Sequence, residues 1–407
     1  MESKYRFAFI VSIATITILL VLNNQLMLGP LLIPISNDLN TSIALTGQLV
    51  AITSSTWAIS GPSGGPFSDT YGRKPVVLVG ITTMIIANLL TATSKQFISI
   101  AIGRLLLGMG AGLVPPTIVA TIGDHVGIKS RGQAIGLMMA FSRIGTIVGL
   151  PLIAMLAESV SWRVPFIVIS ILLSILAVSF IFIFPTTKNE NPGSLEFFKR
   201  IYEAAKTPTF RPLLIANLMT QACTHLITTY FASLLVSRYS YSVSQSGLAN
   251  GVVVGGMAFG NMTGGRLIGT SWGPRAALGA LIVTSSMGPA AFSIESNSFF
   301  TILFSSIMGF AVMLSVTSFL TITTNLNQEA RGASVGLFAA SNQTGAVLGA
   351  VSGGISLEAT SSFSGLGLII TVLAITGVFF GTFSLFRHTN NFQGGVGYIK
   401  EENNTVE

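Results

Sequence analysis

The chain has 407 residues, of which 50% are hydrophobic and only 9% are charged, and its mean hydropathy is +0.73. Charged residues make up about 25% of soluble domains, so this composition excludes a soluble globular protein and indicates an integral membrane protein. The net charge of +7 is therefore assigned to loops that face an anionic membrane surface, and no nucleic-acid partner is expected. The single cysteine, Cys223, excludes an internal disulfide.

The first part of the chain contains six apolar stretches of the length that spans a bilayer, about 17–25 residues. They lie at about 8–32, 43–68, 75–93, 97–122, 131–156 and 163–184. The first stretch is too long for the apolar part of a signal peptide and is interrupted by Gly29-Pro30. We therefore interpret it as a transmembrane helix.

A polar stretch follows the sixth span and separates it from six more. The later spans lie at about 212–236, 243–268, 276–293, 298–322, 332–356 and 362–386. The pattern predicts an all-α membrane protein with twelve transmembrane helices. Its expected parts are a first half at 1–184, a cytoplasmic central loop at 185–210, a second half at 211–387 and a polar cytoplasmic tail at 388–407.

Lysine and arginine are distributed unevenly between the two sides of this arrangement. Sixteen of these bases fall in the termini and loops of one side, whereas only Lys95, Arg163 and Arg238 fall on the other. Basic loops stay in the cytoplasm, so the sequence predicts a multi-pass protein of the cell membrane with both termini cytoplasmic.

The most unusual loop joins the second and third spans. A carboxylate at Asp69 would lie at the negative end of a helix dipole, so it needs a positive partner, either Arg73 or the N-terminus of a neighbouring helix. A simple solvated turn is the alternative. The pattern Gly65-x-x-x-Asp69-x-x-Gly72-Arg73-Lys74 resembles the signature loop of the major facilitator superfamily. This resemblance implies a transporter fold and a gating role for the loop.

The two halves match each other at a constant offset of 200 residues. The matching positions include Gly47 with Gly247, Gly64-Gly65 with Gly264-Gly265, Arg131-Gly132 with Arg331-Gly332, Gly145 with Gly345, and Gly149 with Gly349. Two six-helix halves in the same orientation are the parallel repeat of the major facilitator fold, with a substrate site near the bilayer midplane. Arg131 and Arg331 join the predicted gating set. Asp69 has Gly269 as its counterpart, so a lock formed by Asp69 would be one-sided.

Two arginines lie within spans, where charge is costly and indicates function. Arg104 begins Arg104-Leu-Leu-Leu-Gly-Met-Gly-Ala-Gly112, which resembles the fourth-helix signature of the superfamily. Its guanidinium donors need acceptors, and Asn23, Asn24 and Gln25 of the first span are the candidates. The alternative is that Arg104 only holds the first and fourth helices together.

Arg143 lies twelve residues into its span, counted from Arg131, and so about 18 Å deep at 1.5 Å per residue, near the midplane. Its repeat mate is Gln343, which is also polar. We expect both side chains to face a substrate cavity. The alternative is an arginine that bonds backbone carbonyls between packed helices.

The seventh span carries a polar stripe, because residues three and four apart share one helix face. The stripe consists of Asn217, Gln221, Thr224, His225 and Thr228. We expect Gln221 and His225 to line the cavity or a helix contact, with Cys223 facing away. No carboxylate falls within an apolar core, and Asp38 is the nearest candidate proton carrier, at a position more typical of a helix cap.

The fifth span also resembles the signature of drug–proton antiporters in the same superfamily, in Gly145-Thr-Ile-Val-Gly149-Leu-Pro151, although Leu150 separates Gly149 from the proline. The resemblance implies a secondary active transporter of small organic molecules that exports its substrate in exchange for protons. The alternative is an uptake symporter for a small organic anion or metabolite. The expected partners are the substrate, protons and membrane lipid, with the protein a monomer. No catalytic set, nucleotide-binding loop, cofactor site or metal site is expected.

Overall fold

The computed structural model of the chain describes residues 2–126, 128–183, 210–267, 270, 272–294, 297–326 and 331–392. Within these ranges the chain forms thirteen helices and no strand, which confirms the predicted all-α class. The helices of the first half are α1 (Glu2–Leu26), α2 (Leu28–Asp38), α3 (Ile43–Tyr71), α4 (Arg73–Thr93), α5 (Phe97–His125), α6 (Ile128–Ser159) and α7 (Val164–Ile183). Those of the second half are α9 (Phe210–Tyr239), α10 (Val243–Leu267), α11 (Gly273–Phe292), α12 (Ser298–Leu326), α13 (Arg331–Thr360) and α14 (Ser364–Phe392).

The first predicted span is divided into two helices, α1 and α2, that meet at Met27. Pro30 explains the position of the break, because its ring clashes with the carbonyl of residue 26 and removes a backbone donor. The helical chain then continues to Asp38, beyond the predicted limit at residue 32. Counting α1 and α2 as one segment, the helices reproduce the twelve predicted spans in order.

Seven of the helices are long and apolar enough to cross a membrane by themselves: α1, α4, α5, α6, α7, α12 and α14. The remaining long helices are α3, α9, α10, α11 and α13, of which α3, α10 and α13 are the richest in glycine, serine, threonine and asparagine. These residues lower the hydropathy of a helix but allow close packing and hydrogen bonds between helices in a membrane.

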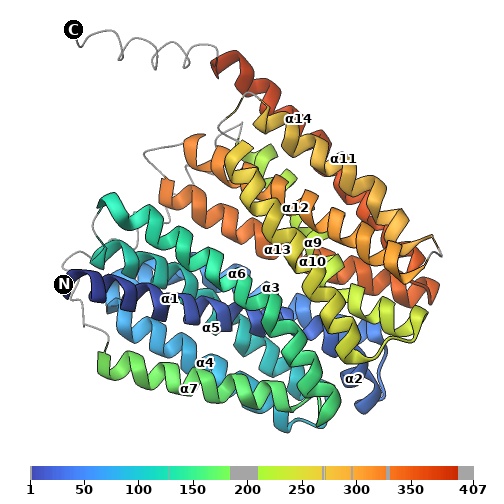
Figure 1. Cartoon of the computed structure of the whole chain (residues 1–407), viewed down its shortest axis with the longest axis horizontal. Coiled ribbons are helices and arrows are strands. Elements are labelled where there is room, and N and C mark those ends of the chain that lie inside the picture. The colour runs from blue at the N-terminus through green and yellow to red at the C-terminus, as the bar shows by residue number, and fades with distance from the viewer. Residues whose placement is uncertain are drawn as a thin grey trace.

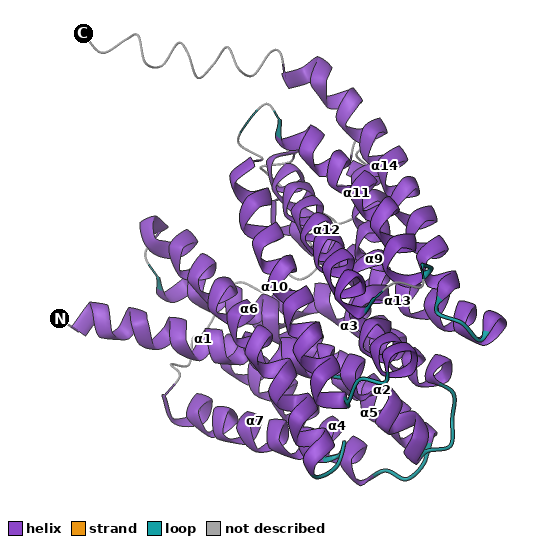
Figure 2. Ribbon diagram, turned by 45° about the vertical axis from the view of Figure 1, so that its right-hand side comes forward, coloured by secondary structure: helices purple, strands orange, loops and turns teal. Residues whose placement is uncertain are grey.

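The helices form two bundles, each with its own apolar core (Figures 1 and 2). One core is built mainly from α1 to α7 and the other from α9 to α14. In Figure 1 the bundles lie together at the end where α2 is labelled, and they diverge toward the end where α1 begins and α14 ends. We call the latter end the basic side and the former the opposite side. Residues 185–209 of the predicted central loop lie outside the described residues, and Phe210 begins α9.

Glycines set the distance between several neighbouring helices. A Cβ atom at Gly108 of α5 would collide with the carbonyl oxygen of Thr53 in α3. Gly255 of α10, by contrast, has nothing within 4 Å of an added Cβ. The first glycine is therefore required by packing and the second is not.

The second half ends later than predicted. Helix α14 continues to Phe392, so the first residues of the predicted tail at 388–407 belong to a helix. Residues 393–407 lie outside the described residues.

We expect Gly108→Ala to lower the free energy of unfolding by about 1–3 kcal/mol, the usual cost of overpacking. Gly255→Ala is the matched control, because it adds the same methyl group to a helix without a contact. The melting temperature of each purified variant measures the difference. Equal melting temperatures for both variants would contradict the packing assignment.

Candidate functional site

The loop between α3 and α4 is a sharp turn on the basic side. Asp69 lies in the last turn of α3, and α4 begins at Arg73. Gly72 joins them with φ 91° and ψ 153°, a conformation that residues with a Cβ rarely adopt. Glycine at this position therefore has a direct structural reason.

Arg73 is the positive partner of Asp69. The buried guanidinium forms an ion pair with Asp69 and a second with Asp124 of α5, in which Nε lies 2.9 Å from Oδ2. It also donates to the hydroxyl of Ser68. Lys74 donates from Nζ to the carbonyl oxygen of Ile181 at 2.7 Å, which ties the loop to α7.

Asp124 was missing from the predicted site. It lies in the last turn of α5, where the helix dipole disfavours a carboxylate for the same reason as at Asp69. Its position at a helix end on the basic side was the available signal. The interaction with Arg73 makes the loop part of the packing of α3, α4 and α5.

The two glycines before the loop have different surroundings. An added Cβ at Gly64 would lie 2.6 Å from Pro116 and 2.9 Å from the carbonyl oxygen of Leu113. At Gly65 it would meet nothing within 4 Å. Close packing within the first half therefore depends on Gly64, while Gly65 presents open space. The side chains of the other two predicted gating residues, Arg131 and Arg331, lie outside the described residues.

The predicted polar residues of the interior come together where the two halves meet. Gln25 of α1 donates from Nε2 to Oε1 of Gln343 in α13 at 3.2 Å. Arg143 of α6 is half-buried and lies within electrostatic range of His225 of α9 in the other half. No described carboxylate forms an ion pair with Arg143.

The polar stripe of α9 faces two neighbours. Asn217 donates to Ser341 Oγ at 2.6 Å and to Asn342 Oδ1 at 2.7 Å, both on α13. Gln221 lies against Gly345 of α13. Its Oε1 is buried without a hydrogen-bond partner among the described residues. Further along α9, the carbonyl oxygen of Thr228 lies against Gly29 of α2. The stripe thus forms helix contacts as well as part of the boundary between the halves.

Cys223 faces the other way, as expected. Its side chain is fully buried, and Sγ lies 3.7 Å from the carbonyl oxygen of Ile370 in α14.

The predicted partners of Arg104 are wrong. Its guanidinium is buried over the ring of Phe166 in α7, 4.7 Å from the ring centroid, and none of its three nitrogens has a hydrogen-bond partner among the described residues. Asn24, one of the expected acceptors, is fully buried with both of its side-chain polar atoms also unpartnered in that part of the chain. Gln25 is bonded to Gln343 instead. The stacking on an aromatic ring is a cation–π interaction, which sequence spacing does not reveal.

Asp38, the candidate proton carrier, has a structural partner. It ends α2 on the opposite side and accepts from Nη2 of Arg163 at 2.8 Å. The hydrogen bond and the charge of Arg163 hold the pKa of Asp38 below its usual value of 3.8. Arg163 also donates to the carbonyl oxygen of Ser94 and lies 4.2 Å from the ring centroid of Trp162. Asp38 therefore stays ionised and fastens helices of one half.

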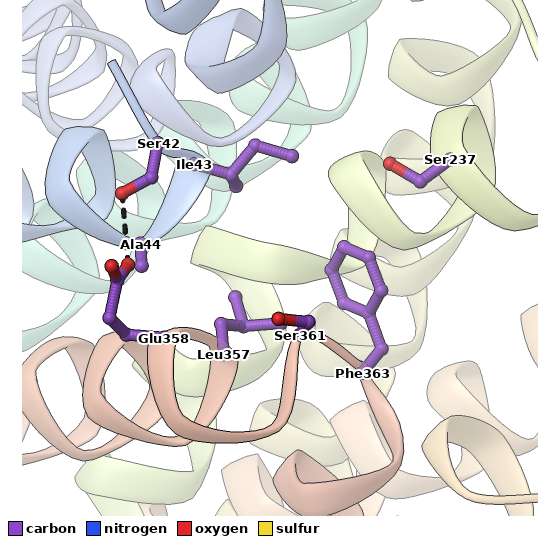
Figure 3. Close-up of a pocket in the computed structure, with 8 residues that line it drawn as sticks. All are labelled: Ser42, Ile43, Ala44, Ser237, Leu357, Glu358, Ser361 and Phe363. Carbon is purple, nitrogen blue, oxygen red and sulfur yellow. Dashed lines mark hydrogen bonds between the residues drawn. The ribbon is translucent and has the colours of Figure 1, made fainter.

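The halves are joined from the middle of the bundle to the opposite side. Every hydrogen bond between described residues of the two halves lies in this region, from Gln25–Gln343 to contacts at the ends of α6 and α13. A cavity of about 400 Å³ opens at this side between α3, α9 and the end of α13 (Figure 3). It is lined by Ser42, Ile43, Ala44, Ser237, Leu357, Glu358, Ser361 and Phe363, none of which belongs to the predicted set. In the described part of the chain the two halves are therefore in contact on the opposite side.

The family model of the Major Facilitator Superfamily matches residues 13–350, which is most of the chain. The chain belongs to the Major Facilitator Superfamily. The family and its fold are those of membrane transporters, so the predicted fold class is confirmed.

Solved structures of superfamily transporters have the same fold. A bacterial homologue of the human lysosomal transporter Spinster, in an inward-facing and occupied conformation, matches with a TM-score of 0.76 and 17% identity over 93% of this chain and 96% of that one. A D-xylose–proton symporter matches with a TM-score of 0.76 and 14% identity over 93% of this chain and 97% of that one.

Curated relatives match over shorter lengths. Multidrug resistance protein 1 of Bacillus subtilis is 31% identical over 192 residues, covering 45% of this chain and 48% of the relative. The hexuronate transporter of the same organism is 31% identical over 144 residues, covering 35% of this chain and 34% of the relative. The chain thus aligns with less than half of the length of these relatives.

We expect Asp69→Asn to leave the melting temperature nearly unchanged, because the pair is partly exposed and Arg73 keeps Asp124. Arg73→Ala should lower it, because two carboxylates then lose their base. Both variants should transport poorly in liposomes if the loop is a gate. Transport by Asp69→Asn at the rate of the unmodified protein would contradict the gating role.

Proposed function

We propose that this superfamily member is a secondary active transporter that moves small organic molecules across the cell membrane by alternating access. In the proposed orientation the basic side is cytoplasmic, as the distribution of lysine and arginine favours. The described conformation then has its closed side outside and corresponds to an inward-facing state. We take the protein to act as a monomer surrounded by lipid.

The observation that carries the proposal is the polar contact between the halves at the depth of Gln25 and Gln343. Arg143 lies in the first half and His225 in the second, so both halves contribute polar groups to one region. A substrate bound there contacts both halves, and the transition between inward- and outward-facing states rearranges these contacts. This is the arrangement that alternating access between two repeats requires.

Arg143 favours substrates with a negative or neutral polar group. Arginine stays charged at physiological pH, and in the described part of the chain no carboxylate forms an ion pair with it. A substrate carboxylate or phosphate would supply the missing partner while it is bound. A positive cavity would disfavour permanent cations, so we propose anionic, zwitterionic or neutral polar substrates.

We propose export coupled to proton entry as the direction of transport. The similarity to a protein named for multidrug resistance supports export, although it covers under half of either chain. The second candidate is uptake of a small organic anion together with protons. The similarity to a hexuronate transporter and the charge of Arg143 support this alternative. Flux measured in oriented vesicles, with and without a protonophore, separates the two directions.

The loop residues Gly65, Asp69, Gly72, Arg73 and Lys74 are proposed to act when the cytoplasmic side closes, together with Arg131 and Arg331. Gly65 supports this role because an added Cβ there meets nothing in the described state, which leaves space for an approaching helix. At Gly64, by contrast, an added Cβ would meet Pro116 and Leu113 of the same half, so no space is left there for another helix.

We expect Arg143→Gln, which copies the repeat mate Gln343, to keep the melting temperature and to weaken substrate binding more than Arg143→Lys does. Losing a charge-assisted hydrogen bond typically costs about 1.5–3 kcal/mol, which corresponds to roughly a tenfold to hundredfold weaker affinity. The ligand is first found by a thermal-shift screen of organic acids, amino acids and sugars on purified protein. Its affinity is then measured for each variant.

Gln221→Leu in α9 of the second half is the comparison, because it removes a polar group without changing charge. It should affect anionic and neutral ligands alike, whereas Arg143→Gln should affect anions most. Rapid transport of a permanent cation such as ethidium, unchanged in Arg143→Gln, would overturn the assignment of Arg143.

A further inference from the structure

Two glutamates close the opposite side, and they are repeat mates. Glu158 lies in the last turn of α6, and Glu358 lies in the last turn of α13. Their positions differ by the same offset of 200 residues that relates the two halves. Each carboxylate reaches across to the other half of the protein.

Glu358 binds the start of α3. Its Oε2 accepts a hydrogen bond from the hydroxyl of Ser42 at 3.1 Å (Figure 3). Ser42 is the N-cap residue of α3, and its hydroxyl oxygen also accepts from the backbone N–H of Leu45 at 3.0 Å. The carboxylate thus extends the capping interactions of a helix in the other half.

Glu158 binds the start of α10 in the same way. Its Oε2 accepts from the hydroxyl of Ser242 at 2.9 Å and from the backbone N–H of Ser244 at 2.5 Å. Ser242, the repeat mate of Ser42, precedes α10, and its hydroxyl accepts from the N–H of Gln245. Both carboxylates therefore bind the serine that caps a helix of the opposite half.

The helix dipoles give each contact a direction. A carboxylate in the last turn of its own helix lies at the negative end of the dipole, where it is disfavoured. The first turn of another helix has unpaired N–H groups and a positive end, which attract a carboxylate. Among the described residues no base forms an ion pair with either glutamate. Each glutamate therefore gains its favourable surroundings from the other half, and only while the two halves are in contact.

Small residues allow both contacts at the same register. Gly354 and Ala154 are repeat mates that lie four residues before Glu358 and Glu158. An added Cβ at Gly354 would lie 3.0 Å from the carbonyl oxygen of Ala44 in α3. Where α6 crosses α10, an added Cβ at Gly247 of α10 would collide with the Cβ of Ala154 in α6. The crossings α3–α13 and α6–α10 are thus close at equivalent positions behind the glutamates.

We propose that Glu158 and Glu358 form a paired latch that holds the outer side of the transporter closed during the transport cycle. That this side faces outward rests on the orientation in the proposed function. The latch itself rests on the hydrogen bonds of Glu158 and Glu358 across the two halves. Both carboxylates leave a helix N-terminus when the outer side opens and return to it on closure. Their role is to set the balance between the two states rather than to bind substrate.

Labelling of a buried reporter tests the latch without any substrate. The reporter is Ala350→Cys in a Cys223→Ser background. Ala350 of α13 is fully buried and packs against the apolar core of the first half. A membrane-impermeant maleimide is added to the outer face of intact cells or oriented vesicles. The rate of labelling then reports how often the outer side opens.

We expect Glu158→Gln and Glu358→Gln each to raise the labelling rate about threefold to tenfold, because each removes charge-assisted hydrogen bonds. The double variant should show roughly the product of the two effects, since the sites are separate. Asp38→Asn is the matched control, because Asp38 is a carboxylate on the same side whose partner, Arg163, belongs to its own half. It should leave the rate unchanged.

An unchanged labelling rate in the double variant would overturn the latch. An equal increase in Asp38→Asn would also overturn it, because any loss of outer charge would then loosen the structure. Melting temperatures of the variants identify a general loss of stability. The labelling result does not depend on the substrate, so a failed transport assignment leaves this test intact.

A second measurement asks whether both contacts must open. Ser42→Cys with Glu358→Cys, and Ser242→Cys with Glu158→Cys, are oxidised to disulfides in the Cys223→Ser background. Either disulfide should stop transport of a substrate established for the unmodified protein, and a reductant should restore it. Full transport with either disulfide formed would overturn the role of that contact in the cycle.

Discussion

The placement of carboxylates at the C-terminal ends of helices is the constraint on which the connections of this protein depend. All five acidic residues whose side chains the structure describes lie in the last turn of a helix: Asp38, Asp69, Asp124, Glu158 and Glu358. The helix dipole disfavours a negative charge at that end, so each of them needs a partner from another element. These partners determine which helices are held together at the two ends of the bundle.

The five partnerships fall into two classes. Asp69 and Asp124 share Arg73, and Asp38 pairs with Arg163, so these three carboxylates fasten helices within the first half. Glu158 and Glu358 instead bind helix N-termini of the opposite half. The first class persists when the halves move as rigid bodies, whereas the second is lost. A carboxylate at a helix C-terminus requires a positive partner in both classes. In the first class this partner holds helices of one half together, and in the second it forms a contact that depends on the conformation.

Sequence reasoning predicted the fold well because hydropathy and the 200-residue repeat are properties of whole segments. The twelve spans, the contact of Arg73 with Asp69 and the orientation of Cys223 followed from spacing and helix geometry. Arg104 was assigned to the wrong partners, because its stacking on Phe166 depends on how α5 and α7 pack. The division of the first span at Met27 was also missed, although Pro30 lies close to it. The extension of α14 to Phe392 was missed because polar residues near a membrane surface still form helices.

The latch residues carry a signal in the sequence that hydropathy does not reveal. Glu158 and Glu358 fall outside the predicted spans, so neither is marked as a charge at membrane depth. The offset of 200 residues that relates glycines and arginines of the two halves also relates Ser42 to Ser242 and Glu158 to Glu358. A polar residue that recurs in both halves at a helix end is a candidate for a contact between them, because the pseudo-symmetry of parallel repeats brings each into the same surroundings.

The two sides of the protein differ in symmetry. On the closed side both repeats supply a glutamate and a capping serine, so the two crossings α3–α13 and α6–α10 are held by equivalent interactions. On the basic side Asp69 has Gly269 as its repeat mate, and no second carboxylate exists at the equivalent position of the sequence. A symmetric pair must be released on both crossings for the halves to separate. The charged loop on the basic side makes its ion pairs within the first half in the described state, so a contribution to closing that side would need a new contact of this single loop with the other half.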